Sequence, residues 1–193
     1  MKKIVFLFLM LACAGAQAQT GDLVDTATQQ GSLTKWSELV KTVELDRTLH
    51  GKGPFTIFAP SDQAFARIQP STMALLTKPE NRVALMNLLS YHIVPGKIMT
   101  GDFKSMAYPT RINADLQITK NGTTLMVNSS HITQPDIETS NGVIHIIDDT
   151  LFPPGVKVET TTEQSVNGKP TQNQQQIIDI HPAITAPKTG VTR

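Results

Sequence analysis

The chain has 193 residues, of which 39% are hydrophobic and 17% charged. This length fits one domain with an appendage, and the apolar content excludes a highly charged disordered polymer. The formal charge of the full chain is +1. Removal of Lys2 and Lys3 with the N-terminal leader described below leaves 15 of the 17 basic residues against 16 acidic ones, which gives a charge of −1. Such a chain does not attract phosphate polymers or anionic lipid, so we expect no nucleic acid partner and no binding to a membrane surface.

Residues 1–18 have the pattern of a secretory signal peptide. Lys2 and Lys3 form a positive start, an apolar run extends from Ile4 to Leu11, and Ala16-Gln17-Ala18 provides a small-x-small cleavage pattern. The apolar run is shorter than the about 20 residues that cross a bilayer, and no later stretch approaches that length. The sequence predicts a periplasmic or secreted protein that does not span the membrane.

Cys13 is the one cysteine of the chain. Cleavage after Ala18 removes it, so we expect neither a disulfide nor a thiolate nucleophile nor a cysteine-ligated metal in the mature protein. The alternative is a lipoprotein anchored through Cys13, although Met10 and Leu11 are poor residues ahead of a lipidated cysteine.

Two helices are predicted in the first third of the mature chain. Asp22 is expected to cap a short helix that carries Leu23, Val24 and Ala27, and Ser32 is expected to cap the next one. The second helix has apolar residues at steps of three and four, which predicts a single buried stripe of Leu33, Trp36, Leu39, Val40 and Val43.

A turn cluster at residues 51–54 leads into the β-prone run Phe55–Ala59, which is predicted to be a buried strand. Ser61 or Asp62 is expected to cap the helical turn that follows. The strongest helix is predicted from Pro79 to Tyr91, and its shared face is expected to contain Val83, Met86, Leu89 and Ile93.

From Lys97 onward the hydrophobic period changes to two, which indicates antiparallel strands. Residues 116–119 and 125–127 are predicted to form a hairpin around Asn121-Gly122, because these residues tolerate the positive backbone angles of a tight turn. The run Val143–Ile147 has strong strand preference and is predicted to be a central strand. Helices followed by strands indicate an α+β fold.

The composition changes after residue 155. Residues 156–193 are rich in Thr, Gln and Pro and show no sustained hydrophobic period, so we predict a mostly disordered tail. The run Ile177–Ile180 is the exception, and it could add a strand or serve as a contact point.

Two long segments resemble the two signatures of the fasciclin (FAS1) domain family. The first is GPFTIFAPSDQAF, from Gly53 to Phe65, and the second is NGVIHIID followed by LFPP, from Asn141 to Pro154. Positions that match the family motifs are Thr56, Phe58, Pro60, Asp62, Phe65, Asn141, Gly142, His145 and Asp148. The resemblance covers about Gly21 to Gly155 and implies one FAS1 domain at residues 19–155, with several α-helices packed on a β-wedge or bent sandwich of about seven strands.

Between these signatures, Tyr91-His92 resembles the family's Tyr-His motif and Asp136-Ile137 its Asp-Ile motif. Both segments are linked to integrin-dependent cell adhesion in animal members, so the resemblance implies binding roles for Tyr91, His92, Asp136 and Ile137. The competing interpretation, which we favour, is structural, because a Tyr and a His at a helix end among apolar residues normally bond inside the domain.

No catalytic arrangement is apparent in the sequence. Ser61 lacks a Gly-x-Ser-x-Gly elbow and is explained as a helix cap, and there is no Gly-rich phosphate loop and no suggestive pair of carboxylates. The histidines lack the close spacing of metal ligands, although His131 and His145 could meet across strands near Asp136 or Asp148; all five are His50, His92, His131, His145 and His181. We therefore expect a noncatalytic protein without metal or cofactor.

The leading hypothesis is a secreted or periplasmic interaction protein that contributes to cell adhesion, matrix contact or biofilm association. Its partner would be a protein or a polysaccharide at the cell surface or in the periplasm. The alternatives are a small-molecule or glycan receptor with a groove between helices and wedge, and an accessory subunit of an envelope complex. One repeat offers little avidity, which a homo-oligomer would supply.

Overall fold

The protein is described by a computed structural model at residues 21–162 and 174–179. A seven-stranded mixed sheet has the order β2-β1-β7-β6-β5-β4-β3. Its strands are β1 (Phe55–Pro60), β2 (Ile93–Pro95), β3 (Ala107–Pro109), β4 (Asp115–Asn121), β5 (Thr124–Val127), β6 (Ser130–Thr139) and β7 (Gly142–Ile147). The helices are α1 (Leu23–Gln29), α2 (Thr34–Thr42), α3 (Asp46–Leu49), α4 (Asp62–Ala66), α5 (Pro70–Leu76) and α6 (Arg82–Tyr91), with 3-10 turns η1 (Pro79–Asn81) and η2 (Thr100–Asp102).

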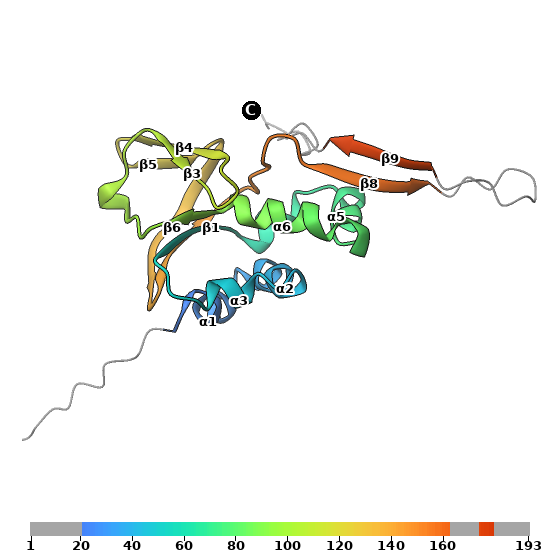
Figure 1. Cartoon of the computed structure of the whole chain (residues 1–193). Coiled ribbons are helices and arrows are strands. Elements are labelled where there is room, and N and C mark those ends of the chain that lie inside the picture. Colours follow the sequence, from blue (N-terminus) through green and yellow to red (C-terminus); the bar gives the residue numbers. More distant parts are fainter. Residues whose placement is uncertain (1–20, 163–173, 180–193) are drawn as a thin grey trace, which may run out of the picture.

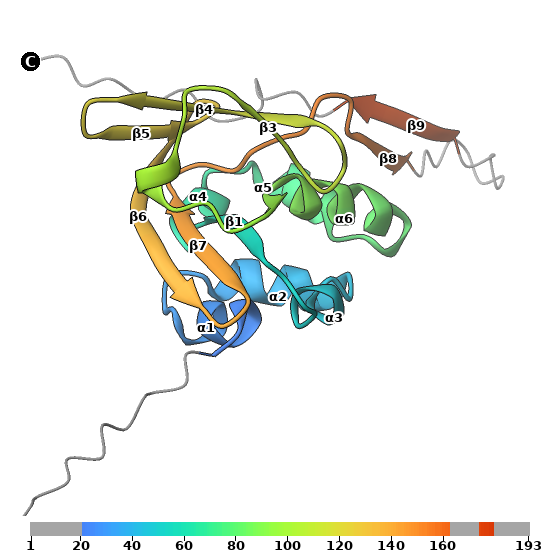
Figure 2. The same cartoon turned by 60° about the vertical axis from the view of Figure 1, so that its left-hand side comes forward.

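The helices gather on one side of this sheet (Figures 1 and 2). Helices α1, α2 and α3 form a group beside β1, β6 and β7, while α5 and α6 lie between this group and the hairpin of β4 and β5. None of the helices in the described ranges is both long and apolar enough to span a bilayer. The arrangement confirms the predicted α+β fold with about seven strands.

Strands β1 and β7 form a parallel pair in the interior of the sheet, between β2 and β6. Phe55 faces Gly142 and Pro60 faces Ile147, so the two strands pair along their whole length although they are far apart in the chain. Every residue of β7 is buried, which confirms its predicted central position. Strands with continuous apolar runs are expected where both faces of a sheet are covered.

Two clusters of buried side chains cover the two faces of these central strands. The helical core contains Trp36, Leu39, Leu85 and Leu89 together with Ile57 and Ile144 from the sheet. The strand core contains Phe58, Tyr91, Phe103, Leu116, Ile118 and Ile147. Successive residues of β1 therefore alternate between the two cores, because neighbouring side chains of a strand point to opposite faces.

The predicted stripe of α2 is confirmed, whereas its predicted cap is wrong. Leu33 occupies the N-cap position and provides no side-chain bond. Instead Asp62 accepts hydrogen bonds from the backbone N–H groups of Thr34 (3.3 Å) and Lys35 (2.7 Å). Ser61 caps α4 by accepting from Ala64 N at 3.2 Å, so the two adjacent residues cap two different helices.

The predicted face of the long helix is also wrong in part. Residues 79–81 form η1, and α6 begins only at Arg82. Val83 is 64% exposed and Met86 38% exposed, while Ala84, Leu85, Leu88 and Leu89 are buried. The helix carries two apolar stripes, and the core is covered by the one that contains three leucines.

Beyond the domain, β8 (Lys157–Thr162) pairs antiparallel with β9 (Gln174–Asp179), with Lys157 opposite Asp179. Residues 177–179 of the run Ile177–Ile180, where the sequence allowed a strand, lie in β9, and Ile180 is outside the described residues. The signal peptide and the rest of the predicted tail lie outside the described residues, so both stay predictions.

Candidate functional site

Tyr91, the first residue of the Tyr-His motif, lies inside the domain at the end of α6. Its side chain is in the strand core, and the residue is 3% exposed. The Oη atom donates to Asp115 O at 2.8 Å and accepts from Asn128 Nδ2 at 3.2 Å. The phenol therefore ties α6 to β4 and to the turn that follows β5, and both of its hydrogen-bonding functions are used within the domain.

His92 follows at the C-cap of α6 and is completely buried. Its Nδ1 donates to Leu88 O at 2.8 Å, and its Nε2 accepts from Leu151 N at 3.0 Å. These two bonds require the neutral imidazole with the proton on Nδ1. Burial lowers the pKa of His92 to about 4, because the charged ring would lose its hydration.

Asp136 and Ile137, the Asp-Ile motif, lie at an irregularity in the pairing of β6 with β7. Asp136 has a φ of 58°, and its carboxylate accepts from both Thr100 N (2.9 Å) and the Thr100 hydroxyl. Ile137 is half-buried, packs against the helical core and is opposite Ile144 of β7. The left-handed backbone conformation of Asp136 at this bulge directs its carboxylate toward Thr100. The bulge thereby holds η2 against β6.

His145 connects this bulge to the interior. The ring is fully buried between Phe58 and Phe103, at centroid distances of 5.4 and 5.2 Å. Its Nε2 donates to Ile98 O at 2.9 Å and its Nδ1 accepts from Asp136 N at 3.1 Å. Burial lowers the pKa of His145, so the neutral ring is the form that fits these bonds.

Two further motif residues, Thr56 and Asp148, form hydrogen bonds to the backbone after β2 and within β6. Thr56 is buried; its Oγ1 donates to Gly96 O at 2.7 Å and accepts from Ile98 N at 2.9 Å. Asp148 accepts from His131 N at 2.7 Å and lies 3.4 Å from the His131 ring. Of the remaining motif residues, Phe58, Pro60 and Phe65 are buried, and Asp62 caps α2 as described above.

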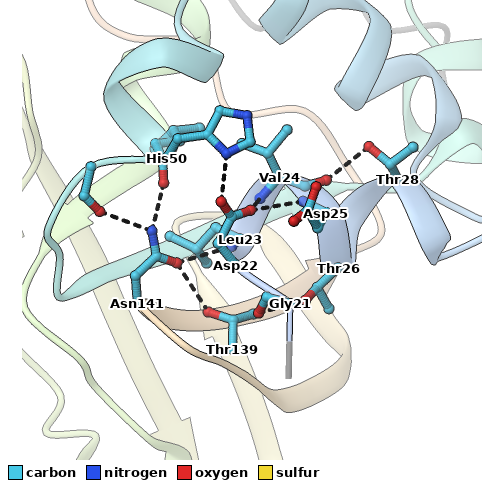
Figure 3. A network of polar contacts seen from close by, with 12 residues as sticks. Gly21, Asp22, Leu23, Val24, Asp25, Thr26, Thr28, His50, Thr139 and Asn141 are labelled. Carbon is cyan, nitrogen blue, oxygen red and sulfur yellow. Dashed lines mark hydrogen bonds and ion pairs between the residues drawn. The ribbon is translucent and has the colours of Figure 1, made fainter. Parts of the chain in front are cut away.

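Asn141 is the centre of a network that joins α1, α3 and β7 (Figure 3). Its Nδ2 donates to Leu49 O (2.7 Å) and Gly51 O (3.0 Å), and its Oδ1 accepts from Leu23 N (2.9 Å). The next residue has no space for a side chain, since a Cβ on Gly142 would lie 2.1 Å from Phe55 O. Asn141-Gly142 therefore locks the helices to the sheet where the parallel pair begins.

Asp22 and His50 form the outer part of the same network, as Figure 3 shows. Asp22 caps α1 through Val24 N and Asp25 N, both at 2.9 Å, as the sequence predicted. Its other oxygen contacts His50 Nδ1 at 2.5 Å. Hydrogen bonding to Asp22 raises the pKa of His50; burial raises the pKa of Asp22, but donors from Asp25 and His50 outweigh it and lower the pKa overall.

Among the hollows on the surface of the described domain, two combine residues from distant segments. One of about 480 Å³ lies at the end of α3, the start of β1 and the β6–β7 turn, and it brings together His50, Lys52, Lys97, Thr139 and Ser140. The other, of about 330 Å³, is lined by residues of η1 and α6, by Ile112 and by 153–156. No local pattern in the sequence predicts either hollow, because each joins segments that are far apart in the chain.

Comparison with known proteins decides the family. The model of the fasciclin domain matches residues 31–153. The chain belongs to the fasciclin domain family. Protein sll1483 of Synechocystis is 34% identical to this FAS1 chain over 132 residues, which are 68% of this chain and 73% of that protein.

Some of the matched proteins are longer than this chain, and the matching FAS1 region makes up only part of their length. Transforming growth factor-beta-induced protein ig-h3 of Sus scrofa is 33% identical over 163 residues, which cover 82% of this chain but 21% of that protein. A solved FAS1 domain pair from the insect cell adhesion molecule Fasciclin I matches with a TM-score of 0.62 and 17% identity, over 69% of this chain and 51% of that one. At this identity the likeness shows the fold.

The FAS1 domain does not assemble the histidine cluster considered from the sequence. His145 is buried with Asp136 Oδ1 at 3.9 Å, whereas His131 is exposed beside Asp148. Within the described ranges, no three His, Cys, Asp or Glu side chains are placed to hold a metal. His181 lies outside those ranges. The polar groups of the family motifs are instead engaged in bonds that hold loops and helices on the sheet.

Proposed function

We propose that this FAS1 protein is an exported, noncatalytic interaction module that contributes to attachment between cells or between cells and matrix, including biofilm. One observation carries the proposal: the polar side chains of the family motifs are used for internal bonds, as the complete pairing of buried His92 illustrates. A group held in this way is not free to act as a base or nucleophile without unfolding. The outer surface is then left as the part that meets other molecules.

The relatives support this setting. The matched structure is described as part of an insect cell adhesion molecule, and the predicted signal peptide would place the present chain outside the cytoplasm. In this proposal Tyr91, His92 and Asp136 serve the fold, and Ile137 packs on the core. Contact with a partner would come from exposed residues around them.

Gene deletion tests the proposal in the producing organism. We expect lower surface attachment and biofilm mass after deletion, restored by the complete gene but not by a gene lacking codons 2–18, which would keep the protein inside the cell. Attachment and biofilm mass that stay at the parental level after deletion would contradict the proposal. So would turnover of a substrate by the purified protein.

A further inference from the structure

The larger of the two hollows described above brings together basic side chains from two separate segments, the loop between α3 and β1 and the segment after β2. His50 follows α3, Lys52 lies in the turn before β1, and Lys97 follows β2, yet all three line the same open space of about 480 Å³. No Asp or Glu belongs to its lining. A concave surface of this kind raises the local potential more than scattered charges do, because it focuses the field.

The nearest acidic partners leave one basic group unneutralised. His50 is held by Asp22, and Lys97 Nζ lies 2.6 Å from Glu138 Oε2, whose side chain is 58% exposed. For Lys52, the described residues provide neither an ion pair nor a hydrogen bond to the side chain. An exposed pair such as Lys97 with Glu138 costs little to open, so Lys97 is also available to a stronger partner.

The floor of the hollow is rigid. A Cβ on Gly53 would lie 2.0 Å from Asn141 O, so backbone packs directly on backbone. Asn141 fixes Gly51 from the other side, and Gly96 N donates to Pro54 O at 2.9 Å, which holds the chain just before Lys97. A preformed site loses less conformational entropy when it binds a ligand.

The lining favours a sugar over a protein surface. Pro54 is its one sizeable apolar residue, and the exposed Ser140 contributes a hydroxyl group. The polar groups of Thr139 and Asn141 are already bonded within the domain. Protein interfaces depend on buried anchors such as Trp, Tyr and Met, and the hollow has no pocket lined for such an anchor. A hydroxyl group beside two lysines fits a ring that carries hydroxyls and an acid group.

We propose that this hollow binds a carboxylate-bearing saccharide, such as a uronate unit of an acidic polysaccharide. Lys52 and Lys97 meet the carboxylate, and the Ser140 hydroxyl bonds to the hydroxyls of the sugar ring. The proposal deepens the proposed function by naming a class of matrix partner, and it rests on that function for the setting in which the ligand is met.

Calorimetry with an oligogalacturonate tests the site on the mature chain. We expect saturable binding that weakens as salt rises, and no binding of the same oligosaccharide with its carboxylates methyl-esterified. Lys52→Ala should weaken binding about tenfold, because one charge-assisted hydrogen bond is lost, and the double variant Lys52→Ala/Lys97→Ala should abolish it.

Lys41→Ala is the matched control, since it removes an exposed lysine from α2, outside the hollow. It should bind like the parent protein, and all variants should keep the parental melting temperature. Absence of binding, equal binding of the ester, or an equal loss in Lys41→Ala would overturn the proposal. If binding is absent while gene deletion still reduces attachment, the hollow is wrong and the adhesive function stands.

Discussion

The Nε2 atom of His92 accepts a hydrogen bond from Leu151 N at 3.0 Å, which joins the end of α6 to the segment after β7. The bond exists only while the ring is neutral, because a protonated imidazole has no acceptor. The family's Tyr-His motif therefore helps to hold α6 against the segment after β7, and protonation of His92 would break this bond.

Acid should destabilise the protein between pH 6.5 and pH 4. The pKa of His92 is about 4 in the folded chain against 6.5 for an unperturbed histidine, so the unfolded state binds more protons in this interval. Stability is therefore lost as pH falls, by on the order of 3 kcal/mol from His92, and His145 acts in the same direction. Urea unfolding at a series of pH values measures this slope.

His92→Gln should flatten that slope even though it lowers stability at neutral pH. His50→Gln is the control and should keep the slope, because the pKa of His50 is raised and its contribution to stability is lost as pH rises rather than as pH falls. A His92→Gln protein that retains the full parental slope would show that other groups cause the acid sensitivity.

Asp62→Ala should destabilise the protein by about 1–2 kcal/mol, since Thr34 and Lys35 lose the acceptor for their N–H groups at the start of α2. Hydrogen exchange should become faster in the first turn of α2. Ser61→Ala should instead affect α4, because Ser61 bonds to Ala64. Equal protection of α2 in the parent and the Asp62→Ala protein would contradict this assignment.

Asn141→Ala should lower the free energy of unfolding by about 2–4 kcal/mol. The substitution leaves the carbonyls of Leu49 and Gly51 and the N–H of Leu23 without their partner. Asn141→Asp keeps the acceptor for Leu23 but places a carboxylate against two carbonyl oxygens, so it should not restore stability. Thermal melting of both variants checks the prediction, and a parental melting temperature for either one would refute it.

Tyr91→Phe should cost about 1 kcal/mol of stability, because the phenol bonds to Asp115 and Asn128 inside the domain. Surface attachment should then fall only with the fraction of folded protein, as measured in parallel by circular dichroism. Loss of attachment by a fully folded Tyr91→Phe protein would favour the adhesive interpretation of this motif over the structural one.

Local signals in the sequence sufficed for much of the fold. The cap at Asp22 depends on residues two and three positions away, and the buried runs of β1 and β7 show directly that both faces of these strands are covered. The hairpin of β4 and β5 follows from its turn residues, although the two strands meet at Asn121 and Thr124, one position later than expected.

Features that join distant segments could not be predicted in this way. Asp62 caps a helix that begins 28 residues earlier, and a local reading assigns it to its own helix. Lys52 and Lys97 carry no pattern that places them in one hollow. Helix α6 has two apolar stripes. Which of them is buried depends on the shape of the sheet surface that the helix packs against, and the helix sequence alone does not specify it.

The parallel pairing of Phe55–Pro60 with Gly142–Ile147 determines when the domain can fold. A chain that emerges from its N-terminus has made β1 long before its central neighbour exists, so neither core can close until nearly the entire domain is available. Folding that depends on contacts so distant in sequence is slow. The same topology that covers both faces of β1 and β7 in the finished domain therefore delays its collapse until the last strands of the sheet have been made.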